Sequence, residues 1–216
     1  MEVETLEQTI SFVREKLNNA EAGHDWFHVE RVWKNAKLIL EREIADREVV
    51  ELTALLHDIA DSKFHDGDEE IGPRIASDFL LSIGVSAEKV THIQKIIKNM
   101  SFKASLGKVS FHSKEMEIVQ DADRLDAIGA IGIARAFHFG GYKNNPLFDP
   151  QVIPRLNQTK EEYKKNTGTT INHFYEKLLL LKDKMNTITA KAIAEKRHSY
   201  MEGFLSQFYE EWDGHK

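Results

Sequence analysis

The chain has 216 residues, which is enough for one domain with a sizeable buried core. Its net charge of -6 argues against a broad nucleic-acid surface, because phosphate contacts need clustered Lys and Arg. The absence of Cys excludes disulfides, thiolate zinc sites and cysteine nucleophiles. No apolar run approaches the roughly 20 residues that span a bilayer, and the acidic N-terminus lacks a signal core. We therefore expect a cytoplasmic protein with no membrane or nucleic-acid partner, although a small phosphorylated ligand in one local basic pocket remains compatible with the charge.

The first half of the chain reads as a series of helices. Only 12 Gly and 4 Pro are available for turns, and apolar residues recur at helical spacing. Thr5 opens a capping-box pattern, Asp25 and Ala45-Asp46 precede the next two helices, and Ser86 is a good N-cap. The predicted helices run from Thr5 to Leu17, Asp25 to Leu40, Ala45 to His57, Pro73 to about Gly84, and Ser86 to Ile97. Polar loops are expected at Ser62–Gly72 and Ser101–Ser113.

In the second half, helical pattern alternates with one long irregular segment. A helix is predicted from Met116 to about Phe137, and two more from about His173 to Met185 and from Thr189 to Trp212. Between them, residues 138–168 are rich in Gly, Asn and Pro, and a loop of this length in a compact domain is usually functional, often a lid. No strand-length alternation is present. The prediction is an all-α single domain, 1–216, with its core in about 20–137 and the C-terminal helices of 169–212 packed on it.

A His-Asp doublet stands at the end of the apolar run that begins at Leu52. On a period of 3.6 residues, His57 and Asp61 share one helix face, and Asp58 lies about 100° around from His57. An ion between these faces could be held by His57 and Asp58, with Asp61 just above it. Neutral imidazole plus carboxylate suits a first-row transition metal. Two residues elsewhere could complete the set: His28, on a predicted helix, and Asp123, which is followed mostly by small residues.

These residues and their flanks resemble the HD-domain metal-dependent phosphohydrolases, whose pattern is an isolated His, a His-Asp doublet and a distant Asp. The segments that carry the resemblance are HDWFHVERV, LLHDIADSKF, DADRLDAIGAIGIAR and TTINHFYEKLLLLKDKMNT, and they are similar to one bacterial subgroup of small, stand-alone HD hydrolases. The resemblance implies a helical bundle, one or two divalent ions, and cleavage of phosphate esters or anhydrides, commonly of nucleotides. It implies His28, His57, Asp58 and Asp123 as metal ligands. Asp121 is the rival for the last position, but Asp123 is followed by a basic residue, as in the family.

The expected chemistry follows from this ligand set. One divalent ion is favoured, such as manganese, nickel, cobalt or iron, with magnesium also open; it would activate a bound water and neutralise charge on a phosphoryl group. Asp61 is the candidate catalytic acid or base, at a place where nucleotidases of the family commonly carry an acidic residue. Lys63, Arg124 and Asp126 are the candidates for substrate binding. The expected reaction is nucleotide hydrolysis, by a pyrophosphohydrolase acting on triphosphates or by a nucleotidase acting on monophosphates, in enzyme class 3.1 or 3.6.

Other interpretations remain open for several features. Arg124 with Asp126, or Arg31 with a neighbouring acid, would also make ordinary ion pairs. His24 and Asp25 are expected to cap and brace a helix rather than bind metal, and His92 could belong to a second metal site. The leucine run 178–181 would fit the core or a homodimer face. The alternative of another class is a non-catalytic HD module that senses a nucleotide or mediates protein contacts; cleavage of cyclic dinucleotides or of the guanosine alarmone fits the motifs less well.

Overall fold

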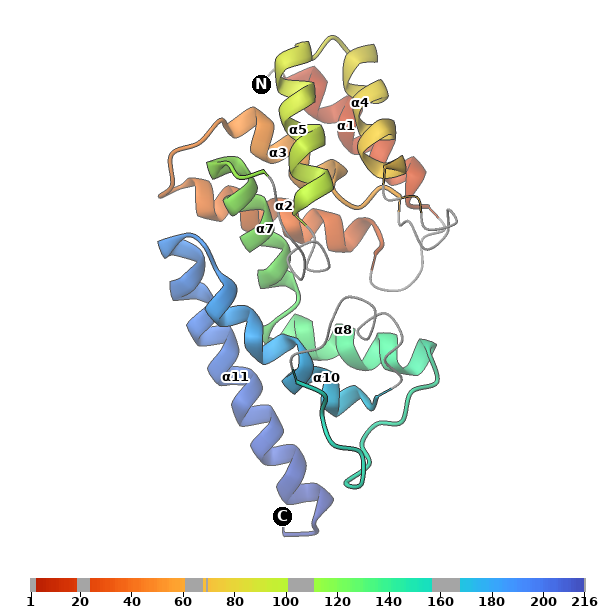
Figure 1. The fold of residues 1–216 in the computed structure, drawn as a ribbon, viewed down its shortest axis with the longest axis vertical. Helices are drawn as coiled ribbons and strands as arrows, with labels where there is room; N and C mark the ends of the chain where they lie inside the picture. Colours follow the sequence, from red (N-terminus) through yellow and green to blue (C-terminus); the bar gives the residue numbers. More distant parts are fainter. Residues whose placement is uncertain are drawn as a thin grey trace. The chain divides into compact units, whose positions relative to one another are not determined.

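The structure is a computed structural model that describes residues 3–18, 24–60, 68, 70–100, 111–156 and 168–215 (Figure 1). Within these ranges every regular element is a helix, which confirms the all-α prediction. The chain forms two compact units, Met1–Asp123 and Arg124–Lys216. Among the described helices, none is both long and apolar enough to cross a membrane.

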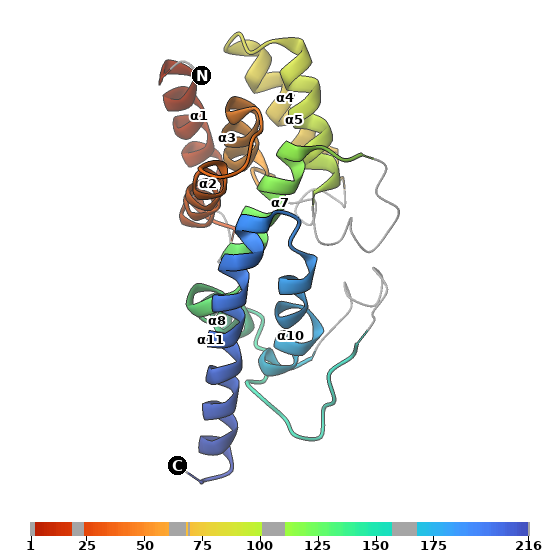
Figure 2. The same cartoon turned by 90° about the vertical axis from the view of Figure 1, so that its left-hand side faces the viewer.

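The first unit is built around its third helix. Its helices are α1 (Val3–Lys16), α2 (Trp26–Leu40), α3 (Arg47–Leu56), α4 (Ile71–Ser82), α5 (Ala87–Asn99) and most of α7 (Lys114–Asp126). Helix α3 packs against α1, α2 and α5, while α4 lies along α5 (Figures 1 and 2). All residues of α3 from Val49 to Leu56 are buried, as expected for a helix covered on several sides. The C-terminal end of this central helix is therefore held firmly by its neighbours.

Side-chain caps set the starts of three of these helices, and at Asp25 and Ser86 the sequence predicted the cap. Asp25 accepts a hydrogen bond from the backbone N–H of His28, Asp46 accepts from Glu48 and Val49, and Ser86 caps α5. The predicted start of α1 at Thr5 is wrong, because the helix already begins at Val3. Helix α4 begins at Ile71, before the predicted end of the loop at Gly72, and carries Pro73 in its first turn as expected.

The second unit packs a long terminal helix against three shorter elements. These are α8 (Gly129–Tyr142), α10 (Thr170–Glu176), the 3₁₀ helix η2 (Leu178–Lys184) and α11 (Ile188–Trp212). Helix α11 contacts α8 and η2, and α10 contacts α8 and η2 (Figure 2). The fully buried ring of Phe174 lies with its centroid 6.0 Å from that of Phe137 and 5.9 Å from that of Phe204. Aromatic contacts thus join α8, α10 and α11 in one core.

Three sequence-based boundaries in the second half are wrong. The predicted continuous helix from Met116 to about Phe137 is interrupted, because Gly129 has a φ of +76° and starts a new helix. A Cβ at Gly129 would lie 3.0 Å from the side chain of Arg197, so glycine also leaves room for this close approach. Helix α8 then continues to Tyr142, which moves the start of the irregular segment from residue 138 to 143. The predicted helix from His173 to Met185 is the pair α10 and η2, and residues 157–167 lie outside the described residues.

Candidate metal centre

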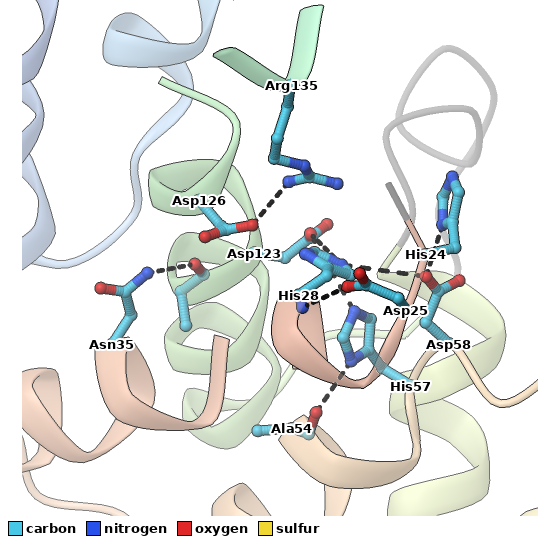
Figure 3. Close-up of polar contacts among 11 residues, drawn as sticks. His24, Asp25, His28, Asn35, Ala54, His57, Asp58, Asp123, Asp126 and Arg135 are labelled. Carbon is cyan, nitrogen blue, oxygen red and sulfur yellow. Dashed lines mark hydrogen bonds and ion pairs between the residues drawn. The ribbon is translucent and has the colours of Figure 1, made fainter. Parts of the chain in front are cut away.

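All four predicted metal ligands lie close to helix ends in the first unit. His28 is in the first turn of α2, His57 is the C-cap of α3, and Asp58 follows it in a turn. Asp123 lies in the last turn of α7. Figure 3 shows the four side chains pointing toward one another. Residues that are up to 95 positions apart in the chain are therefore neighbours in space.

The distances between these side chains match a site for one ion. His28, His57 and Asp58 each offer a ligand atom within 4.8 Å of the others. The Asp123 Oδ1 atom lies 3.6 Å from His28 Nε2 and 4.0 Å from His57 Nε2. Two ligands bound to one ion at about 2.1 Å each are typically separated by about 3–4 Å. His28, His57 and Asp58 are thus spaced as ligands of a shared cation would be, and Asp123 lies beside the Nε2 atoms of the two histidines.

The His57 ring provides the test of whether a cation fits here. Its Nδ1 atom lies 2.8 Å from the backbone oxygen of Ala54, which can only accept, so Nδ1 carries a proton, and in the neutral ring Nε2 then has a free lone pair. Among the described residues, the buried Nε2 atom has no hydrogen-bond partner. A buried polar atom without a partner is costly and needs an explanation. A divalent ion at this point would give Nε2 a partner. Two imidazoles and two carboxylates are suitable ligands for such an ion, so these residues could bind it.

His28 is fixed by the helix that carries it. Its backbone N–H donates to the Asp25 carboxylate at 2.9 Å, and the residue is 2% exposed. The expectation that Asp25 caps this helix is confirmed. The His28 and His57 rings meet edge to face with their centroids 5.4 Å apart. This arrangement turns both Nε2 atoms toward Asp123.

The Asp58 carboxylate is held in its charged form. Burial raises its pKa, but the neighbouring His24, His57 and His28 outweigh this effect and hold the pKa well below its usual range. The largest of the opposing effects comes from His24, whose Nδ1 atom is 2.5 Å from Asp58 Oδ2. Asp58 Oδ2 also lies 3.8 Å from His28 Nε2. At neutral pH the residue is a carboxylate, which is the form that binds a cation.

Asp123 is positioned by a residue that sequence reasoning missed. The buried Asn35 on α2 donates from Nδ2 to the backbone oxygen of Ala122 at 3.2 Å (Figure 3). It therefore ties α7 to α2 next to Asp123. A polar residue on the apolar stripe of α2, beside Val32 and Ala36, was the available signal. Asp121, the rival ligand, is fully buried two positions earlier, about 200° around the helix from Asp123.

The other predicted site residues either lie outside the described residues or make contacts in the second unit. Asp61 and Lys63 lie outside the described residues. In the second unit, Arg124 donates from Nη1 to the backbone oxygen of Lys184, and the buried Asp126 forms an ion pair of 2.6 Å with Arg135 (Figure 3). Any role of these two residues in binding substrate would have to be combined with these contacts.

Two further candidates from the sequence are engaged elsewhere. The Nε2 atom of His92 lies 3.0 Å from Ser113 Oγ and 3.5 Å from Glu115 Oε2, which gives it protein partners around the start of α7. In the leucine run, Leu178 and Leu181 are buried in the second unit, whereas Leu180 is 41% exposed. Two of these leucines thus belong to the core.

Comparison with known proteins was consistent with this site. The sequence model of the HD domain matches residues 26–128, which include all four predicted ligands. The protein YpgQ of Bacillus subtilis, described as uncharacterized, is 40% identical over 215 residues, covering 99% of this chain and 96% of YpgQ.

Solved structures extend the similarity to the whole fold. An HD-superfamily hydrolase from Bacillus thuringiensis is 44% identical, with a TM-score of 0.75 and 97% of both chains covered. A protein from Lactobacillus plantarum reaches a TM-score of 0.86 at 37% identity, with 99% of both chains covered. YpgQ of Bacillus subtilis in complex with ADP has a TM-score of 0.77 at 35% identity, covering 97% of this chain and 95% of that one.

Proposed function

The chain belongs to the HD-domain family, and from this premise we propose that it is a metal-dependent phosphohydrolase acting on a nucleotide. The observation that carries the proposal is the buried Nε2 atom of His57, which has no hydrogen-bond partner in the described part of the chain and lies among His28, Asp58 and Asp123. When bound, a divalent ion would lower the pKa of a coordinated water and neutralise charge on a phosphoryl group. The same four residues are the proposed ligands.

The chain's own residues prepare the site for this role. The Ala54 carbonyl selects the His57 tautomer that presents a lone pair, and the lowered pKa of Asp58 keeps a carboxylate available. Asn35 holds α7 beside Asp123. These contacts reduce the reorganisation needed when ligand binds, which is how a preorganised site gains affinity and rate.

Two further roles belong to the proposal. Asp61, four residues after His57, would take the proton from the attacking water or give one to the leaving group. Lys63, Arg124 and Asp126 would contact the substrate, with the two cationic groups facing phosphate oxygens. A transition ion such as manganese, nickel, cobalt or iron suits the mixed ligand set, and magnesium would bind more weakly through the carboxylates.

The substrate class is supported by the ADP bound to a relative that is 35% identical. ADP carries a base, a ribose and an anhydride, so it supports a nucleoside phosphate as ligand but does not choose between a pyrophosphohydrolase and a nucleotidase. That choice depends on which phosphorus–oxygen bond is cleaved, and hence on whether pyrophosphate or phosphate is released.

The test is a substrate screen with defined metal content. Protein stripped with a chelator is reloaded with each divalent ion and incubated with nucleoside triphosphates and monophosphates, and phosphate and pyrophosphate are measured separately. We expect release with a transition ion, and none above background for Asp123→Ala under the same conditions. Metal-loaded wild-type protein that releases neither product from any nucleotide would contradict the proposal and favour a non-catalytic HD module.

A further inference from the structure

His24 is a partly exposed side chain at the edge of the candidate metal centre. It lies just before Asp25, the N-cap of α2, and its side chain is 34% exposed. Its Nδ1 atom is 2.5 Å from Oδ2 of Asp58, which is 34 positions later in the chain (Figure 3). An imidazole N–H that faces a carboxylate oxygen at hydrogen-bond distance forms a charge-assisted hydrogen bond.

Besides this contact, the Asp58 side chain has few restraints. It lies beyond the end of α3 and its side chain is 19% exposed, so packing restrains it less than the two histidines. Among the described residues, His24 supplies the only hydrogen bond to its carboxylate. A carboxylate on a two-bond side chain would otherwise rotate freely in its terminal torsion.

We infer that His24 is a positioning residue for the metal centre: its Nδ1–H fixes the Asp58 carboxylate in the orientation that binds a divalent cation. The role needs only an N–H at the δ position, which a neutral imidazole provides. Partners of this kind behind a metal ligand typically contribute 10–100-fold to metal affinity. The inference rests on the proposed function only in that the site binds a divalent ion.

Three substitutions distinguish the effect of the δ nitrogen from the effect of the rest of the ring. His24→Asn keeps an N–H donor one bond beyond Cγ, where Nδ1 lies in histidine. His24→Gln carries its donor one bond farther out, and His24→Ala has none. His112→Ala is the matched control, because His112 is an exposed histidine of the same unit that is paired with Glu117 at 3.1 Å.

The experiment titrates Mn²⁺ into each full-length, chelator-stripped protein without nucleotide and follows the electron paramagnetic resonance signal of free Mn²⁺. We expect affinity to fall by about 10–100-fold for His24→Ala and His24→Gln, and to stay close to wild type for His24→Asn and His112→Ala. Circular dichroism in chelator checks that each variant is folded. If His24→Ala does not fold, the Mn²⁺ affinities of the Asn and Gln variants still show whether a donor at the δ position is needed.

Two results would overturn the inference. Wild-type affinity in a folded His24→Ala or His24→Gln protein would show that Asp58 needs no support from this donor. Equal weakening in the Asn, Gln and Ala variants would show that the ring itself, rather than the δ donor, is required. Because no nucleotide is present, a His24-dependent Mn²⁺ site in a protein that hydrolyses nothing would contradict only the proposed function.

Discussion

Replacing His57 with leucine should change stability in opposite directions with and without metal. His57 is almost fully buried, its Nδ1 atom is bonded to the Ala54 oxygen, and its Nε2 atom has no hydrogen-bond partner among the described residues. Leucine fills a similar volume and has no polar atom. The substitution therefore removes one satisfied and one unsatisfied polar group from the same side chain.

The two effects can be weighed against each other for the metal-free protein. Loss of the bond to Ala54 costs about 0.5–1.5 kcal/mol, whereas removal of a buried unsatisfied atom returns about 1–3 kcal/mol. We expect His57→Leu to leave the free energy of unfolding unchanged or to raise it by about 1 kcal/mol in chelator. Most substitutions of buried residues lower it by about 0.5–3 kcal/mol, so the expected sign is unusual.

With metal bound, wild type should instead be more stable than His57→Leu. At a free Mn²⁺ concentration about 100 times the dissociation constant, binding to the folded state alone adds about 2.7 kcal/mol to the stability of the wild type. His57→Leu lacks one of the four proposed ligands and should gain far less. Wild type then becomes the more stable protein, although the variant is at least its equal in chelator.

Urea unfolding of both proteins, in chelator and in Mn²⁺, measures all four free energies. His112→Leu is the control, since an exposed side chain should change stability by no more than about 0.5 kcal/mol in either condition. A loss of more than about 2 kcal/mol for His57→Leu in chelator would mean that Nε2 is satisfied in the folded protein. Equal stabilisation of variant and wild type by Mn²⁺ would refute His57 as a ligand.

Three other outcomes are expected. Asp61→Asn should keep bound metal near the wild-type level while turnover falls by about 10²–10⁴-fold, and a fully active, metal-loaded variant would remove Asp61 from the mechanism. Burial, and to a lesser extent the charge of Lys177, lowers the pKa of His173 from 6.5 to about 3. Stability from this residue is then complete above pH 6.5 and lost toward pH 3 by up to about 1.4 kcal/mol per pH unit, so the advantage of wild type over His173→Gln in urea should shrink between pH 7.5 and 5 and not change above 7.5. Gly132→Ala would place a Cβ 2.2 Å from the backbone oxygen of Ala127 and should lower stability by about 1–3 kcal/mol in thermal melts. Gly141→Ala, which has open space around the added Cβ, is the control and should raise stability slightly.

The sequence predicted helices well where the local signals are strong. Asp25, Asp46 and Ser86 mark helix starts because a short polar side chain can satisfy backbone N–H groups that a helix leaves open. The interruption at Gly129 was missed because the residues around it, mostly Ala, Ile and Gly, continue the apolar pattern on both sides. What breaks the helix is a backbone conformation that periodicity does not register, together with the approach of Arg197 from a distant helix.

For the site, residue types were predictable and partners were not. The four-part pattern located His28, His57, Asp58 and Asp123, whose proximity the structure displays even though their role as ligands stays a prediction. The supporting contact of Asn35 could not be read from sequence, because it ends on a backbone oxygen 87 positions away. Backbone acceptors are identical at every residue, so only the fold decides which one a side chain reaches.

The location of the candidate ligands at helix ends has a physical reason. His28 is the third residue of α2, His57 and Asp58 directly follow α3, and Asp123 is three residues from the end of α7. Within a helix, every backbone group is paired and neighbouring side chains diverge by about 100°. At an end, backbone groups remain open and the chain turns, so the Ala54 oxygen can select the tautomer of His57 and the Asp25 carboxylate can hold the N–H of His28. Such a site can leave a polar atom such as His57 Nε2 without a partner among the described residues, and that atom costs the metal-free protein stability. A substitution that relieves this cost should therefore stabilise the protein in chelator and weaken its metal site at once.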